Sequence, residues 1–354
     1  MRLSAVAVSL LLCFALPGNQ VKGGTAALEK GQTAAGDAMG LQSKGSVKVP
    51  LVGTLVGKAR CDDAGSMYVR FMDDETSRVH HGITKIPIEK INRDGSVAAS
   101  FRIIAALPDI SGKDFFVSGD GRVYQAGFMP DGAVYVAEFT PRGAVNSNVR
   151  LSSSGFIPYQ TLVFPSGEFL LSGTTGLSNG RRPFTAVFDP RGRLIKEIYE
   201  PEDEDSRLRA EAGDRDFLPE EVNAGNTFVW RGDAALGSDG NAYLLRAGSQ
   251  ALVYVISARG DVVGKLRIDS PEPGLVAESI KSGPGTIAIG FLHRGMITGS
   301  IKVVDLQGAP VATYVADDPR VPGVPGCYLH GGFAFLVEDG ERNIQLLTFE
   351  PKSR

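Results

Sequence analysis

Histidine and arginine side chains gather in the short polar segments that separate the apolar runs of this chain. The candidate ligand contacts are Arg78, His81, Arg181, Arg182, His293 and Arg294. Arginine offers a planar fork of donors that matches a carboxylate or a sulfate. If these segments meet on one face, the sequence predicts a cationic site for a small anionic ligand. Solvated loop polarity is the alternative, because Asp73, Asp74 and Glu75 share a segment with Arg78.

Metal binding is the second chemistry to consider. Zinc needs three or four convergent ligands, whereas the adjacent His80 and His81 would face opposite sides of a strand. His330 lies in a predicted inner strand, which makes it the candidate for a residue that reaches the channel. The acidic residues 200–205 lack the spaced Asp, Asn and Gly of an EF-hand loop. We therefore predict no metal or cofactor, and calcium or zinc stays open.

Composition and motifs exclude several classes of function. The chain has 354 residues, a formal net charge of −3, 43% hydrophobic and 22% charged residues, as in an ordinary folded protein. A nucleic-acid-binding protein would need an excess of Lys and Arg, so we expect no nucleic acid as partner. The P-loop and His-Glu-x-x-His motifs are absent from the sequence, and we name no catalytic residue.

The elements that must position these residues repeat along the chain. One unit is a turn with Asp-Gly or Ser-Gly followed by an apolar strand, at residues 62–69, 119–124, 165–171 and 238–244, with weaker copies at 283–289 and 331–336. The other is an alternating strand that ends in a turn glycine, at Gly95, Gly143, Gly192, Gly260 and Gly308. Glycine accepts the positive φ of such turns. Four strands in about 40–50 residues predict one blade of a β-propeller.

The repeats predict an all-β fold with six blades of four antiparallel strands. The last blade ends near residue 351 without an outer strand, and residues 47–56 are the candidate for that strand. An N-terminal strand in this place would close the ring and remove an exposed edge. A pair of β-sandwiches and a ring of seven blades are the alternatives.

The segments Asp-x-x-Gly-x-Φ-Tyr and the turns Φ-x-Φ-Asp-x-x-Gly, where Φ is apolar, resemble the six-bladed propellers of the NHL-repeat type over about residues 47–351. Such propellers include lyases, lactonases, sensor domains and interaction platforms, so the resemblance implies a fold without fixing a function. We predict a non-catalytic module that binds a small anionic ligand or a protein through its loop-rich face. A metal-dependent lactone hydrolase or lyase, with its site in the central channel, is the alternative.

The N-terminus predicts export. Met1 and Arg2 precede an apolar run that Pro17 and Gly18 break, which is the order of a secretory signal. The run is shorter than the ~20 residues that span a bilayer, so we expect no membrane span in the mature chain. We expect a signal peptide at 1–23, a flexible spacer at 24–46 and the propeller at 47–354, with an insertion at about 200–224. The location would be periplasmic or secreted.

Export bears on the two cysteines that would remain in the mature chain. Cys61 and Cys327 stand at the same register, each four residues before a turn glycine, in predicted inner strands of the first and last blades. These blades adjoin where the ring closes, and a disulfide can persist in an oxidising compartment. The bond requires Cα atoms within about 7 Å. Cys61 and Cys327 are thus a candidate disulfide, with two buried free thiols as the alternative.

Overall fold

The computed structural model describes residues 38–72, 86–112, 114–175, 182–199, 232–246, 250–293, 298–316, 321–329, 331–339 and 341–352. The chain divides into two units, Met1–Ala35 and Gly36–Arg354, and every described residue belongs to the second. The predicted signal peptide and the predicted insertion at about 200–224 lie outside the described residues. No helix in these ranges is long and apolar enough to cross a membrane.

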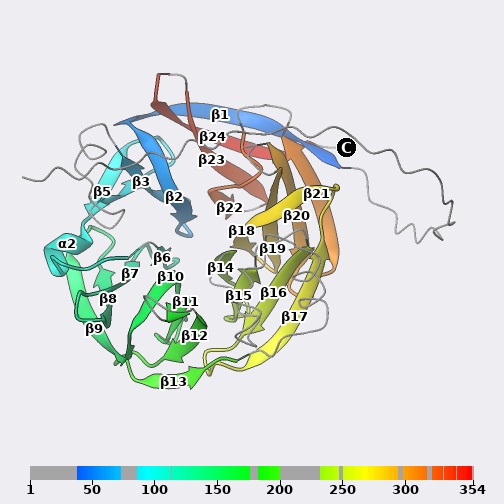
Figure 1. Ribbon diagram of the computed structural model, residues 1–354. Coiled ribbons are helices and arrows are strands. Elements are labelled where there is room, and N and C mark those ends of the chain that lie inside the picture. Colours follow the sequence, from blue (N-terminus) through cyan, green and yellow to red (C-terminus); the bar gives the residue numbers. More distant parts are fainter. Residues whose placement is uncertain are drawn as a thin grey trace, which may run out of the picture. The chain divides into compact units, whose positions relative to one another are not determined.

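The second unit is a β-propeller, in which sheets of four antiparallel strands surround a common axis (Figure 1). Four of its blades are separate sheets, and in each the strands follow one another in sequence order. They comprise β2 (Thr54–Cys61), β3 (Met67–Met72), β4 (Ile88–Ile91) and β5 (Val97–Phe101); β6 (Phe115–Val117), β7 (Val123–Phe128), β8 (Ala133–Phe139) and β9 (Val145–Ser154); β10 (Phe156–Val163), β11 (Phe169–Thr175), β12 (Arg182–Phe188) and β13 (Leu194–Glu197); and β14 (Gly232–Leu236), β15 (Ala242–Arg246), β16 (Gln250–Ile256) and β17 (Val262–Asp269). Helix is almost lacking, and α2 (Ile103–Ala106) is the one α-helix of the described ranges.

The remaining strands form one sheet of eight rather than two separate sheets. Its order is β18-β19-β20-β21-β1-β24-β23-β22. The strands are β18 (Leu275–Gly283), β19 (Thr286–His293), β20 (Gly299–Asp305), β21 (Pro310–Ala316), β22 (Cys327–Leu329), β23 (Gly332–Glu338), β24 (Asn343–Pro351) and β1 (Met39–Val52). β1 pairs with β24 in antiparallel fashion and with β21 in parallel over three residue pairs. Hydrogen bonding therefore gives four separate blades and one larger sheet, not the six separate blades that the repeats predict.

The folded unit begins earlier than the predicted boundary at residue 47. β1 already starts at Met39, and Leu41 is buried among Tyr314, Phe333 and Phe349. The predicted spacer 24–46 is thus wrong for its last residues. Gly, Ser and Lys dominate that stretch, so it carries too little apolar alternation to announce a strand.

The predicted turn glycines are confirmed in both repeat units. Gly95, Gly143, Gly192, Gly260 and Gly308 all have φ between 78° and 88°. The same left-handed region holds the glycines of the turns that follow the inner strands, among them Gly65, Gly121 and Gly240. A side chain is strained in this region, which explains why glycine recurs at these positions.

Apolar faces of neighbouring sheets bury one another around the ring. One cluster joins Tyr68 and Phe101 of the first sheet to Phe115 and Phe139 of the second. The innermost strands also contact each other in the cyclic order β2, β6, β10, β14, β18, β22 and back to β2. These contacts hold the strands that surround the axis at fixed positions, so side chains from distant parts of the sequence meet there.

Candidate functional site

Five charged side chains meet on the axis of the propeller, and we call them the axial cluster. They are Lys58 and Arg60 of β2, Asp114 just before β6, Asp233 of β14 and Lys281 of β18. Apart from these charges, the buried side chains of the inner strands are apolar or uncharged, such as Gln160, Thr161 and Ser279. A charged side chain in such a strand must find its partners on the axis, because burying it unpaired is costly.

Asp233 is the centre of the axial cluster. Its side chain is fully buried, and its Oδ1 accepts a hydrogen bond from Arg60 Nη1 at 2.6 Å. Lys58 Nζ lies 3.3 Å from Oδ1, and Lys281 Nζ lies 3.5 Å from Oδ2. Three cations therefore surround one carboxylate, and Arg60 makes a short, charge-assisted hydrogen bond to it.

Both aspartates of the axial cluster also join neighbouring blades through the backbone. Asp114 Oδ2 accepts from the Thr161 amide of β10 at 3.1 Å, and Asp233 Oδ2 accepts from the Ile280 amide of β18 at 3.2 Å. Each amide follows a register shift, which separates Pro158 from Gln160 in β10 and Ala277 from Ser279 in β18. β10 and β18 are the innermost strands of their blades, and the amides on the free edge of such a strand have no strand partner. The aspartate of the preceding blade accepts from one of them.

Electrostatics within the axial cluster favour the charged forms of Asp233 and Arg60, but not that of Lys281. Burial would raise the pKa of Asp233, but Arg60, Lys58 and Lys281 hold it well below the usual range. Burial would lower the pKa of Arg60, but Asp233 and Asp114 raise it. For Lys281 burial prevails over the attraction of Asp233, and its pKa is lowered. With three basic and two acidic groups, the ionised axial cluster carries one positive charge in excess.

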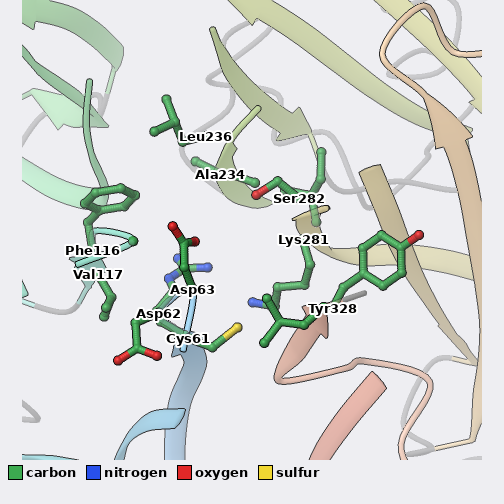
Figure 2. Close-up of a pocket in the computed structure, with 15 residues that line it drawn as sticks. Cys61, Asp62, Asp63, Phe116, Val117, Ala234, Leu236, Lys281, Ser282 and Tyr328 are labelled. Atoms are coloured by element: carbon green, nitrogen blue, oxygen red, sulfur yellow. The ribbon is translucent and has the colours of Figure 1, made fainter. Parts of the chain in front are cut away.

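A cavity of about 130 Å³ opens beside the axial cluster, at the ends of the inner strands. Arg60, Cys61, Asp62, Lys281 and Tyr328 are among its lining residues. Figure 2 shows Cys61, Lys281 and Tyr328 converging from separate strands. The cavity lies next to the turns that follow the inner strands, since Asp63 and Gly119 also line it. This is the face opposite to the one for which the sequence predicts ligand binding.

The predicted ligand contacts are only partly visible. Arg78, His81, Arg181, Arg294 and His330 lie outside the described residues. Arg182 is the first residue of β12, although its side chain is not described. His293 ends β19 and is half-buried, and its amide donates to the Thr298 carbonyl. The structure thus neither unites nor separates these residues, and the loop-face site stays a prediction.

The axial cluster escaped the sequence analysis, although the repeats contain the signal. Asp114 precedes the turn Ser118-Gly119-Asp120-Gly121 by the same spacing that separates Asp233 from Gly237-Ser238-Asp239-Gly240. An aspartate that recurs at one position of an apolar inner strand is best explained by a shared partner on the axis.

Metal ligands are sparse near the axis. In the described ranges no group of three or more His, Cys, Asp or Glu is placed to hold a metal ion. The carboxylates of Asp114 and Asp233 are the acidic oxygen donors of the axial cluster, and both already accept from Arg60. A divalent cation at this point would have to displace the guanidinium group.

Comparisons with known proteins give a likeness of fold. No family model matches the chain, and no curated protein matches its sequence. Among solved structures, a calcium-binding protein, regucalcin from Agrobacterium tumefaciens, is similar with a TM-score of 0.52 and 13% identity, over 90% of this chain and 97% of that one. A protein of unknown function from Bacteroides caccae has a TM-score of 0.44 and 12% identity, over 73% and 80% of the two chains.

The similarity to regucalcin agrees with the propeller fold seen here. At 13% identity it shows the fold alone. The NHL-repeat type has no matching family model and stays a prediction.

Proposed function

We propose that this protein is a non-catalytic ligand-binding propeller that takes a small anion, of the carboxylate class, in the cavity beside the axial cluster. The observation that carries the proposal is that Arg60 and Lys281, two cations of this cluster, line the cavity together with Asp62 and Asp63. A cavity of about 130 Å³ exceeds the ~10–15 Å³ that one water molecule requires. It therefore has room for a small carboxylate.

Lys281 is the group best placed to meet such an anion. Its Nζ donates to the Ala59 carbonyl at 2.9 Å and lies near Asp233, while its side chain lines the cavity. An ammonium group has three donors, so one is left over by these contacts. A carboxylate that accepts it would gain a charge-assisted hydrogen bond in a region that water reaches poorly.

The enzyme alternative, a metal-dependent lactone hydrolase or lyase, is less well supported. The regucalcin neighbour is a calcium-binding protein, which keeps calcium among the ions to be tested. Calcium prefers six to eight oxygen ligands, and the carboxylates of the axial cluster are engaged by Arg60 and by backbone amides. An anion fits this arrangement better than a cation does.

The proposal is tested by calorimetric titration of the purified protein with malonate, sulfate and calcium chloride as probes. We expect malonate to bind, and Lys281→Met to weaken binding about tenfold or more, since a hydrogen bond to a charged group contributes ~1.5–3 kcal/mol. Lys302→Met is the matched control, because Lys302 lies on β20 and donates to the Asp269 carbonyl. Malonate that fails to bind, or that binds Lys281→Met equally well, would overturn the proposal.

Two other results of the titration would each favour a different function or a different binding site. Stoichiometric calcium binding would favour the metal-dependent alternative. Weaker malonate binding by Arg182→Ala and Arg294→Ala, with an unchanged melting temperature, would place the anion on the loop-rich face that the sequence predicts.

We also propose that the ring has six blades and that β1 closes it. Six inner strands contact each other in a closed cycle, and the sheet of eight divides into two antiparallel sets of four at its parallel β1–β21 pairing. In this division β1 is the outer strand of the blade formed by β22, β23 and β24. Parallel pairing with β21 then covers the edges of both blades.

Export is the third part of the proposal. Its support is the order of charge, apolar run and break at the N-terminus. N-terminal sequencing of the protein recovered from a host's secreted or periplasmic fraction tests it. A mature chain that begins near residue 24 is expected, and a protein retained with Met1 in place would contradict export.

A further inference from the structure

We infer that Cys61 and Cys327 form a reversible thiol–disulfide site, in which Cys61 attacks and Cys327 resolves. Oxidation would join the inner strands β2 and β22 covalently, between the first and the last blade. This site is independent of the proposed anion, because it needs only the two sulfurs and their surroundings. The placement of the sulfurs, their unequal access and the charge beside them each support it.

The two thiols lie within reach of each other. Both are free cysteines, and each acts on the pKa of the other. Cys61 ends β2, Cys327 begins β22, and these two strands are neighbours in the ring. Cys61 Sγ also lies 3.9 Å from the carbonyl oxygen of Gly326, the residue before Cys327. A disulfide would therefore connect groups that are already in contact.

Access differs between the two sulfurs. Cys61 is half-buried and lines the cavity beside the axial cluster, whereas Cys327 is fully buried. Figure 2 shows the Cys61 sulfur at the wall of this cavity, on the side from which the Lys281 side chain extends. A thiol–disulfide reagent that enters the cavity reaches Cys61 first. This asymmetry assigns attack to Cys61 and resolution to Cys327.

Charge favours a thiolate at Cys61. The ionised axial cluster has one positive charge in excess, and the charge of Lys281 attracts a thiolate at Cys61. The thiol of Cys327 lowers the pKa of Cys61 against the effect of burial, while burial raises the pKa of Cys327 well above its usual value. The thiolate is the reactive form of cysteine, so the more accessible of the two sulfurs is also the activated one.

The exchange is balanced when the oxidant is a small-molecule disulfide. The Cys61 thiolate attacks one sulfur of the reagent, whose S–S bond breaks and releases one thiolate. Cys327 then loses its proton to the solvent, and its sulfur attacks Cys61 and releases the second thiolate. Two cysteines are oxidised and one disulfide is reduced to two thiols. The reverse sequence, driven by a thiol, restores Cys61 and Cys327.

The Cys61 thiolate and the ligand anion would compete for the same positive charge. A neutral disulfide would leave that charge to the ligand. Anion binding is therefore not needed for the thiol chemistry, and each can be measured without the other.

Glutathione redox buffers supply the test. The purified full chain is equilibrated with glutathione disulfide, quenched with acid and N-ethylmaleimide, and mapped by mass spectrometry of its peptides, which separates Cys61 and Cys327 from Cys13. We expect a Cys61–Cys327 cross-link in the wild type. Cys327→Ser should accumulate glutathione on Cys61, and Cys61→Ser should leave Cys327 unmodified.

A second measurement keeps the test sharp if a cysteine variant folds poorly. Iodoacetamide should modify Cys61 of the reduced wild type more than tenfold faster than Cys327, and Lys281→Met should slow this reaction, whereas Lys302→Met should not. Two free thiols in the oxidised wild type would overturn the inference. Modification of Cys61 and Cys327 by iodoacetamide at equal rates would also overturn the inference.

Discussion

Arg60 Nη1 and Asp233 Oδ1 lie 2.6 Å apart, although 173 residues separate them in sequence. They belong to β2 and β14, which lie three places apart in the cycle of six inner strands. Their contact therefore crosses the axis of the ring instead of joining neighbours. Because Asp114 and Lys281 attach to the same pair, four inner strands are linked through one buried network.

Removal of the carboxylate of Asp233 should destabilise the protein strongly. Asp233→Asn leaves Arg60 and Lys281 without their shared buried anion, and breaking a buried pair on one side costs about 3–5 kcal/mol. Urea unfolding followed by tryptophan fluorescence or circular dichroism measures this loss. Asp261→Asn is the matched control, because its pair with Lys196 is exposed and should contribute less than about 1 kcal/mol. Equal losses for both variants would show that the axial cluster is not a buried network.

The same carboxylate should make stability depend on acidity. The pKa of Asp233 is held well below the value of about 3.9 in an unfolded chain. Its contribution is therefore complete above that value and is lost as pH falls toward the folded pKa. About one pH unit below that value, the unfolded state binds close to one more proton at this residue than the folded state does. As the pH decreases in this range, the free energy of unfolding should therefore decrease more steeply for the wild type than for Asp233→Asn, by up to about 1.4 kcal/mol per pH unit. Parallel curves for the two proteins would contradict this.

The sequence predicted the blades but not their contacts at the axis. Turn glycines such as Gly95 and Gly143 recur because local φ requirements repeat in every blade, and that information is local. The pairing of Arg60 with Asp233 depends on how many blades close the ring and on the register shift between Val56 and Arg60 in β2. Neither the number of blades nor the side chains that face the axis can be derived from the sequence of one strand alone.

Tyr68 should secure the contact between the first two blades. Its hydroxyl lies 2.9 Å from Asp62 Oδ2 and 3.3 Å from the Gly121 carbonyl of the next blade, and the residue is fully buried. Tyr68→Phe deletes a hydrogen bond to a charged group and should lower the free energy of unfolding by about 1.5–3 kcal/mol. Tyr199→Phe is the control, since Tyr199 is 60% exposed and should change stability by less than about 0.5 kcal/mol. If Tyr68→Phe leaves the melting temperature unchanged, the hydroxyl group does not stabilise the contact between these blades.

Two turn glycines with the same backbone conformation should respond differently to alanine. Gly192 and Gly240 have φ of 79° and 81°, so both substitutions share a strain of about 1–2 kcal/mol. A Cβ at Gly192 would lie 2.2 Å from the backbone oxygen of Arg150 in the neighbouring blade, whereas nothing lies within 4 Å at Gly240. Gly192→Ala should thus lower the melting temperature clearly more than Gly240→Ala. Similar shifts would mean that the turn moves away from β9 without cost.

If β1 closes the ring, its buried side chains should stabilise the protein, and Leu41→Ala should lower the free energy of unfolding. Leu41 of β1 is buried at 3% exposure against Phe333 and Phe349, and Leu→Ala at such a site costs about 2–5 kcal/mol, in part through the cavity left behind. Lys44→Ala is the control on the same strand, because its pair with Glu350 is exposed and contributes little.

Deletions extend this test from one side chain to the whole strand. A chain lacking residues 1–37 keeps β1 and should unfold like the full chain, whereas a chain lacking residues 1–52 exposes the edges of β21 and β24. Unpaired strand edges promote association, so the longer deletion should aggregate and melt at a lower temperature. If both deletions behave alike, β1 does not close the ring, and the sheet of eight has to be explained in another way.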